Sequence, residues 1–160
     1  MIKNLQIREA SKHDYQALKQ LFQLENEFSA SLEPEHVIPT SDVFREEEIK
    51  KLIDAETTLL IVGEKSGAVT GLLLCHHEKV EAKRWLPEQN RLYIEQVFVG
   101  PDFRRQGVAS ALIDHAAQWG KSRGSTAIYL DVWASNTAAR ALYKKLGLEE
   151  KQVFMKLGLD

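Results

Sequence analysis

The chain has 160 residues, of which 44% are hydrophobic and 28% are charged, and its formal net charge is −2. This length suits one packed core, so we expect a single domain over residues 1–160. The near balance of charge argues against a basic surface that attracts nucleic acid or a membrane. No apolar stretch is long enough to span a membrane and no apolar signal core follows Met1, which predicts a cytoplasmic protein.

The first part of the chain predicts a strand followed by two helices. Residues 2–8 begin as a short strand, and Ser11 with Asp14 forms an acidic variant of the capping box that starts a helix. Apolar residues keep helical spacing as far as Phe28. A second helix is expected to start near residues 41–42, with an acidic first turn that suits the helix dipole.

The middle of the chain predicts three strands. Residues 57–65 and 68–80 are β-rich runs around a turn signal, which is typical of a hairpin. A polar loop is expected over residues 77–90, and residues 91–99 supply the third β-rich run.

The last part predicts alternating helices and strands. Apolar residues repeat with helical period from Val108 to about residue 120 or 124. Residues 126–133 predict a strand, residues 136–146 a helix, and residues 151–157 a final strand. The complete order is strand, two helices, three strands, helix, strand, helix and strand.

The single cysteine, Cys75, has no cysteine partner within the chain for a disulfide. It lies in an apolar run that reads as a buried strand, which favours a packing role, although the neighbouring His76 and His77 keep a reactive thiol as an alternative. Adjacent strand residues point to opposite faces, so these two histidines cannot hold one metal ion together. We expect no metal site.

The segment from residue 97 to residue 113 has the outline of an anion site. A strand ends, a proline-containing turn follows, and a helix opens at Gly107, whose missing side chain lets a phosphate approach the unpaired amides of the first helical turn. Arg104 and Arg105 add positive charge. The spacing matches neither the Walker pattern nor the three-glycine dinucleotide fingerprint, which disfavours ATP and NAD. An ordinary basic turn that caps a helix is the alternative.

The pattern Arg104-x-x-Gly107-x-Ala109 after a strand resembles the pyrophosphate-binding motif of the GNAT acetyltransferase superfamily, and the order of elements resembles that superfamily over essentially the whole chain. The resemblance implies an α/β (α+β) fold with a mixed central sheet of about six to seven strands flanked by four helices. It also implies acetyl-CoA as the cosubstrate. Many members have glycine where this chain has Arg105, which removes some backbone freedom.

The resemblance also implies which residues contact coenzyme A. The backbone of three strand residues bonds the pantetheine arm, and seven consecutive residues of the turn hold the pyrophosphate. The strand residues are Val97, Phe98 and Val99, and the turn residues are Arg104, Arg105, Gln106, Gly107, Val108, Ala109 and Ser110.

Asn136 and Tyr143 are seven residues apart, which puts them two turns apart on one helix face, with Ala139 and Arg140 between them. The resemblance implies that Asn136 touches the pantetheine with this helix segment, and that the Tyr143 hydroxyl protonates the leaving thiolate. A phenol is protonated at neutral pH and can give its proton to an alkyl thiolate. The alternative for Tyr143 is a core aromatic that packs the helix on the sheet.

Glu95 is an unusual carboxylate within the apolar strand of residues 91–99, because a buried charge is costly unless it is paired or has a raised pKa. A polyamine acetyltransferase branch has a similar strand, whose glutamate accepts the ammonium proton through water. The resemblance therefore implies Glu95 as general base and the backbone N–H near Val97 as oxyanion donor. An edge-facing glutamate or a salt bridge is the alternative.

These observations predict an acetyl-CoA-dependent N-acetyltransferase acting on a primary amine of a polyamine, amino acid or amino sugar. A peptide or protein acceptor, or an acyl-CoA-binding sensor without turnover, are the alternatives. Acidic residues of the first two helices could attract a cationic amine, and Trp85 and Phe44 could contact the acceptor or cover the core. A homodimer is possible by analogy with relatives.

Overall fold

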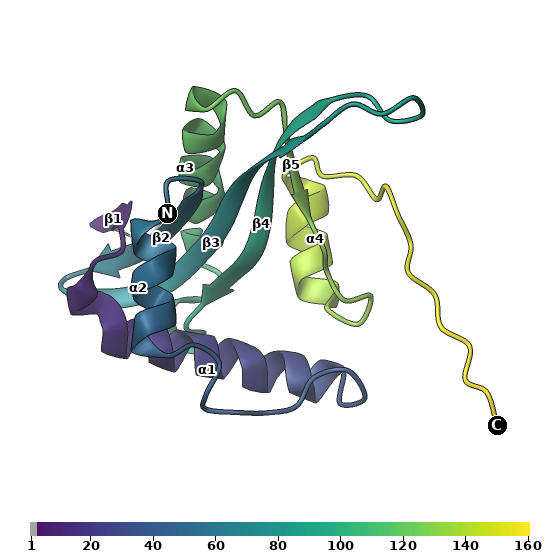
Figure 1. Cartoon of the computed structure of the whole chain (residues 1–160). Helices are drawn as coiled ribbons and strands as arrows, with labels where there is room; N and C mark the ends of the chain where they lie inside the picture. The colour runs from purple at the N-terminus through teal and green to yellow at the C-terminus, as the bar shows by residue number, and fades with distance from the viewer. Residues whose placement is uncertain (1–2) are drawn as a thin grey trace.

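The computed structural model describes residues 3–160 as one mixed five-stranded sheet with helices on both faces (Figure 1). The strand order is β1-β2-β3-β4-β5; the first four strands are antiparallel neighbours, and β5 is parallel to β4. The elements are β1 (Leu5–Glu9), η1 (Lys12–Asp14), α1 (Tyr15–Leu32), α2 (Glu46–Asp54), β2 (Thr58–Lys65), β3 (Ala68–Val80), β4 (Gln89–Val99), η2 (Pro101–Phe103), α3 (Val108–Ser122), β5 (Ala127–Leu130) and α4 (Thr137–Lys145). The expected α/β class and four helices are confirmed. The sheet has five strands, whereas six to seven were expected.

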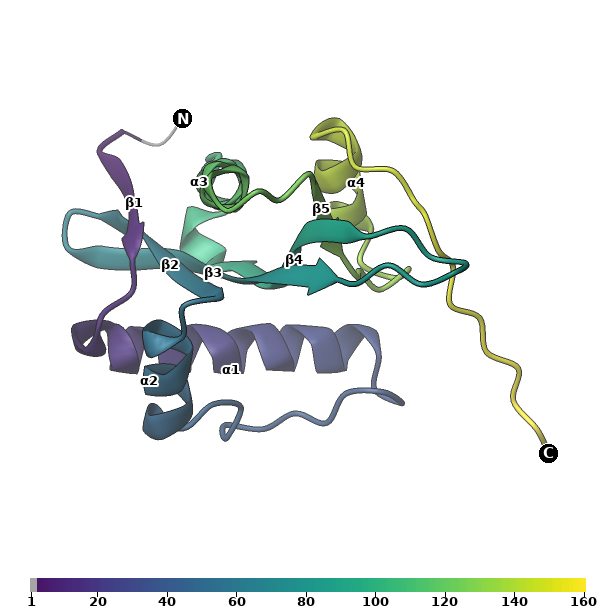
Figure 2. The same cartoon turned by 45° about the horizontal axis from the view of Figure 1, so that its top comes forward.

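The sheet lies between two helical layers, with α1 and α2 on one face and α3 and α4 on the other (Figure 2). Alternate residues of β2 and β3 enter two separate cores because successive strand side chains point to opposite faces. On the α3 face the buried strand residues are Leu59, Ile61, Leu73, Cys75, Leu92 and Ile94. On the α1 face they are Leu60, Val62, Leu72, Leu74 and Phe98.

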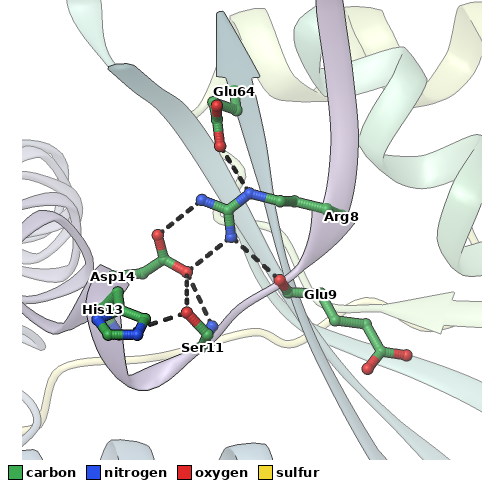
Figure 3. Close-up of polar contacts among 6 residues, drawn as sticks. All are labelled: Arg8, Glu9, Ser11, His13, Asp14 and Glu64. Carbon is green, nitrogen blue, oxygen red and sulfur yellow. Dashed lines mark hydrogen bonds and ion pairs between the residues drawn. The ribbon is translucent and has the colours of Figure 1, made fainter. Parts of the chain in front are cut away.

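An ion-pair cluster around Arg8 joins β1 to β2 and to the start of α1 (Figure 3). The Arg8 guanidinium donates two hydrogen bonds of 2.8 Å to the carboxylate of Asp14 and one of 2.6 Å to Glu64. Asp14 also accepts from the backbone N–H of Ser11, which completes the predicted capping box. These hydrogen bonds, above all those from Arg8, lower the pKa of Asp14. The Asp14 carboxylate of the capping box therefore also holds β1 in place through Arg8.

The chain differs from the sequence prediction at the starts of β1 and α2. The strand expected to begin at Ile2 begins at Leu5, and Ile2 itself lies outside the described residues. α2 begins at Glu46 rather than near residue 41, because the Asp42 carboxylate is bound by the Arg45 side chain and not by helical amides. The backbone N–H of Arg45 then donates to Glu48 at 2.8 Å and starts the helix.

The hairpin of β3 and β4 is longer than expected. The polar loop predicted over residues 77–90 is reduced to residues 81–88, because the strands remain paired as far as Val80 and Gln89. Opposite charges explain this extension, since Arg91 donates to Glu78 directly across the pair at 2.7 Å.

The final strand predicted over residues 151–157 is wrong. The chain has no helix or strand after residue 147, and residues 149–160 are all exposed. A β-rich sequence forms a strand only where a neighbouring strand accepts its hydrogen bonds, and no described residue pairs with this segment. None of the described helices is long and apolar enough to cross a membrane.

Candidate active site

β4 and β5 separate halfway along β4. Their parallel pairing is confined to Arg91–Ile94 against Ala127–Leu130, whereas β4 stays paired with β3 as far as Val99. Residues 95–99 therefore have a strand on one side only among the described residues, and the backbone groups of that open edge are available to a ligand. Figure 1 shows β4 and β5 diverging, with β5 next to α4. This is the segment in which Val97, Phe98 and Val99 are expected to bind the pantetheine arm.

A β-bulge at Glu95 marks the point of separation. Ile94 pairs with Cys75 and Gln96 pairs with Leu74, which leaves Glu95 without a partner on β3. The extra residue changes the phase of the strand, so that Ile94 and Val97 both face the core under α3. A bulge of this kind re-aims a side chain next to a site.

The Glu95 side chain lies on the α1 face of the sheet, in a chain of three side chains. Its Oε2 lies 2.5 Å from Nε2 of His76, and Nδ1 of His76 lies 3.0 Å from the Thr58 hydroxyl. Glu95 is 41% exposed, so the carboxylate is paired and still reaches solvent. The sequence did not indicate His76 as its partner, because only the register of β3 against β4 brings the two together.

Further polar side chains surround this group. The Tyr93 hydroxyl donates to Asp131, after the end of β5, at 2.6 Å. The hydrogen bond to Asp131 and burial raise the pKa of Tyr93 to about 12. Tyr93 is the cross-strand partner of His76, which puts this pair beside Glu95.

The loop after β5 also touches the end of α1. The Ser135 hydroxyl donates to Glu33 at 2.6 Å, and the His36 and Trp133 rings lie 5.3 Å apart. These contacts connect the loop after β5 to the end of α1.

Tyr143 lies on the opposite face of the sheet. It projects from α4 and packs against the core under α3, to which Val97 and Val99 also belong. Burial raises the pKa of the Tyr143 phenol to about 12. Glu95 and Tyr143, the two predicted proton-transfer residues, therefore lie on opposite faces of the sheet.

The turn before α3 has the geometry of an anion cradle. Gly107 is the N-cap with φ of 85°, and a Cβ built on it meets nothing within 4 Å. No side chain of the described residues caps the helix, and its first internal hydrogen bond runs from Ala111 N to Gly107 O. Within residues 3–160, the amides of Val108, Ala109 and Ser110 have no acceptor, which fits a pyrophosphate at the positive end of the helix dipole.

Arg105 adopts φ of 63°, in the left-handed region that glycine occupies without strain. The turn accommodates this non-glycine residue where the related motif often has glycine. The Gln106 amide donates to the Asp102 carbonyl at 3.1 Å and holds the turn together.

The Arg104 side chain stabilises the turn from the α1 side. Its Nε donates to the Val99 carbonyl at 3.2 Å, and its guanidinium lies 5.5 Å and 5.3 Å from the Phe28 and Phe98 ring centres. The side chain therefore ties the turn to β4 and α1, and its charge is directed to these partners.

Asn136 precedes α4 rather than lying inside it. Its Oδ1 caps the helix by accepting from Ala139 N at 3.1 Å, which leaves the side-chain amide nitrogen for other partners. Arg140 donates to the Ala134 carbonyl at 3.2 Å and to Glu150 at 2.5 Å. The expected helix of residues 136–146 is thus Thr137–Lys145, with Asn136 as its cap.

Three remaining expectations have clear outcomes. Cys75 is buried, and burial raises its pKa to about 12, which supports packing over reactivity. Phe44 packs on Phe22 in the core at 4.6 Å. Trp85 is 75% exposed in the loop between β3 and β4 and does not cover the core.

Two curated relatives share part of this sequence. An uncharacterised N-acetyltransferase of Methanocaldococcus jannaschii is 35% identical over 106 residues, which are 65% of this chain and 45% of the relative. The ribosomal protein bS18-alanine N-acetyltransferase of Escherichia coli K12 is 42% identical over 57 residues, 36% of this chain and 38% of the relative. The match thus spans less than half of either relative.

Solved structures share the fold over the whole chain. A mutant of the BH1408 protein from Bacillus halodurans has a TM-score of 0.92 at 21% identity and covers 99% of both chains. An aminoglycoside N-acetyltransferase in complex with CoA has a TM-score of 0.74 at 20% identity, again over 99% of both chains. The sequence model of the acetyltransferase (GNAT) family matches residues 16–148. The chain therefore belongs to the acetyltransferase (GNAT) family.

Proposed function

We propose that residues 1–160 form one acetyltransferase domain that transfers the acetyl group of acetyl-CoA to a primary amine of a small cationic molecule. The observation that supports this most directly is the position of Glu95 and Tyr143 on opposite faces of the sheet, where β4 and β5 separate. An amine that arrives on the α1 face then meets a carboxylate, and a thiolate that leaves on the α3 face meets a phenol.

The residues present fit coenzyme A at two places. The three open amides at the start of α3 and the space above Gly107 suit the pyrophosphate. The open edge of β4 over residues 97–99 offers backbone groups to the pantetheine arm, and the free amide nitrogen of Asn136 is a further donor. Acetyl-CoA supplies an acetyl group activated as a thioester.

Glu95 is the proposed general base. Its carboxylate accepts a proton from the acceptor ammonium, directly or through water, because it is exposed on the face where the amine arrives. His76 Nε2–H donates to the carboxylate and fixes its orientation, and Nδ1 then accepts from the Thr58 hydroxyl. With this order of donors, the neutral His76 imidazole carries its proton on Nε2 and not on Nδ1.

Tyr143 is the proposed general acid. A pKa of about 12, raised by burial, keeps the phenol protonated at neutral pH, so Oη carries a proton to donate on the α3 face. Its contacts with the core under α3 hold the ring in place.

The acceptor class follows from the charge around Glu95. Three carboxylates lie on the α1 face of the sheet, those of Glu78, Glu95 and Asp131. Arg91 is the cation paired with Glu78. This excess of negative charge favours a cationic amine. The name of the aminoglycoside N-acetyltransferase neighbour agrees with a polyamine or amino sugar, whereas the local match to the bS18-alanine enzyme favours the alternative of a peptide N-terminus.

The proposal is tested by incubating the full chain with acetyl-CoA and separate pools of polyamines, amino sugars, amino acids and peptides. Thiol release and mass spectrometry are the readouts. Acetylation of a small cationic amine is the expected result, with Glu95→Gln and Tyr143→Phe as impaired controls. Acetylation of peptides alone would establish the alternative acceptor, and coenzyme A binding with no thiol release would identify a sensor.

A further inference from the structure

The hydrogen bond between Tyr93 and Asp131 joins β4 to the segment after β5 at the point where the two strands separate. The last parallel pair between these strands is Ile94 with Leu130. Tyr93 precedes Ile94, Asp131 follows Leu130, and the Tyr93 hydroxyl donates to the Asp131 carboxylate at 2.6 Å. A side-chain bond therefore continues the connection between β4 and β5 by one residue beyond the end of their backbone pairing.

The helix after β5, α4, depends on its connecting loop for its position. None of the residues of α4, all of which the structure describes, is buried, and Tyr143 reaches the core under α3 only as a partly buried side chain. Figure 1 shows α4 running back beside β5, so the loop of residues 131–136 lies at the end of the sheet where β4 and β5 have separated. An element with few buried contacts is easily displaced. The direction in which the chain leaves β5 therefore sets where Asn136 and Tyr143 lie.

This loop is held at both ends. At its far end the Ser135 hydroxyl donates to Glu33 of the segment after α1. At its near end Asp131 accepts from Tyr93, which among the described residues is the only side chain of β4 that bonds the loop. The hydrogen bond to Asp131 and burial raise the pKa of Tyr93 to about 12, so the phenol keeps its proton at neutral pH. Only this bond ties the loop to the strand that carries Glu95.

We propose that Tyr93 is a positioning residue, whose hydrogen bond to Asp131 fixes the direction in which the chain leaves β5 and so holds α4, with Tyr143, beside the open edge of β4. The effect of this bond on rate rests on the proposed acetyl transfer, whereas its effect on structure does not. Because a displacement of about 1 Å can lower a rate by about 100-fold, loss of the bond should be measurable in kcat.

Four variants separate this role from the negative charge of Asp131. Tyr93→Phe and Asp131→Ala each remove the hydrogen bond and should lower kcat by about tenfold. Asp131→Asn keeps an oxygen that accepts from the phenol, so its kcat should stay near the wild-type value, while KM for a cationic amine rises because the charge is lost. Tyr129→Phe is the matched control, since Tyr129 is the cross-strand partner of Tyr93 and its hydroxyl bonds no described residue.

The double variant Tyr93→Phe with Asp131→Ala completes a mutant cycle. It should be no slower than either single variant, because both changes remove the same interaction. Additive losses of kcat would show that the two residues act separately, and the proposal would then be wrong. Equal losses of kcat in Asp131→Asn and Asp131→Ala would also overturn it, since the charge and not the bond would then matter. Denaturant unfolding checks that each variant is folded.

Hydrogen exchange tests the same bond without turnover. The amides of Asn136 and Arg140 are hydrogen-bonded at the start of α4. Their exchange should be about tenfold faster or more in Tyr93→Phe and Asp131→Ala, and unchanged in Asp131→Asn and Tyr129→Phe. Unchanged exchange in Tyr93→Phe would contradict the positioning role even if kcat falls. If the wild type transfers no acetyl group, the proposed function fails, and exchange still decides whether Tyr93 positions α4.

Discussion

The carboxylate of Glu95 lies 2.5 Å from Nε2 of His76, although the two residues are 19 positions apart in the sequence. The contact exists because a bulge turns Glu95 out of the β4 ladder toward the neighbouring strand. It gives the proposed base a fixed orientation while leaving it open to an acceptor amine.

Replacing Glu95 by glutamine keeps the shape of the side chain and removes the proton acceptor. We expect kcat/KM for the amine to fall by about 100-fold or more, and the decrease of rate toward acidic pH to disappear. Steady-state rates measured across pH check this. An unchanged pH profile would return Glu95 to a structural role.

His76→Ala should act through the position of Glu95. The loss of one hydrogen bond to a charged group corresponds to about a tenfold decrease in kcat, with a smaller change in the acetyl-CoA dissociation constant. Thr58→Val removes only the outer hydrogen bond, so its effect should be smaller. Partial recovery in His76→Gln, whose amide still donates, would separate positioning from general loss of structure. Equal activity of His76→Ala and the wild type would contradict the role.

Tyr143→Phe should lower kcat by about 100-fold and leave acetyl-CoA affinity nearly unchanged, because only the proton donor is removed. The pH dependence of the stability of Tyr143→Phe provides a second test. The folded pKa of about 12 lies above the ordinary value of 10.0, so the contribution of Tyr143 to stability is complete below pH 10 and is lost as pH rises toward 12. Denaturant unfolding of the phenylalanine variant should therefore depend less on pH in this window.

Gly107→Ala and Gly124→Ala form a matched pair at the two ends of α3. Both glycines have φ of 85°, and neither has an atom within 4 Å of an added Cβ. Each substitution should cost about 1 to 2 kcal/mol of stability through backbone strain. Only Gly107→Ala should weaken acetyl-CoA binding, by about tenfold or more, because only that position faces the proposed pyrophosphate. Calorimetric titration with acetyl-CoA distinguishes the two variants. Equal acetyl-CoA affinities of Gly107→Ala and Gly124→Ala would show that the turn at Gly107 does not bind the pyrophosphate.

Arg8→Met should destabilise the protein by about 2 kcal/mol without lowering kcat, because it leaves the Asp14 carboxylate, 6% exposed, without its cation far from the proposed site. The pKa of Asp14 is held below its ordinary value of 3.8 chiefly by Arg8. The stabilisation of the folded protein by the ion pair between Arg8 and Asp14 is present above pH 4. It is lost as pH falls through the lowered pKa that Asp14 has in the folded protein. The stability difference between the two proteins should therefore shrink in acid. A constant difference between pH 7 and pH 2 would contradict this account.

The sequence by itself determined the order of the elements from β1 to α4 and the turn at Gly107. Both depend on local chemistry, since hydrophobic period, the Ser11 capping signal and a left-handed glycine each act within a few residues. The helix end that offers free amides and the strand that contains Glu95 could be predicted for this reason.

Only the tertiary structure decided which side chains meet. The register of β3 against β4 brings His76 to Glu95, and the early end of the β4 and β5 pairing opens the edge of residues 95–99. The same cause explains the wrong strand at residues 151–157, whose pattern is that of a strand but with which no described strand pairs. Strand pairing joins distant residues, so a local pattern can specify the face of a strand but not the neighbour that completes it.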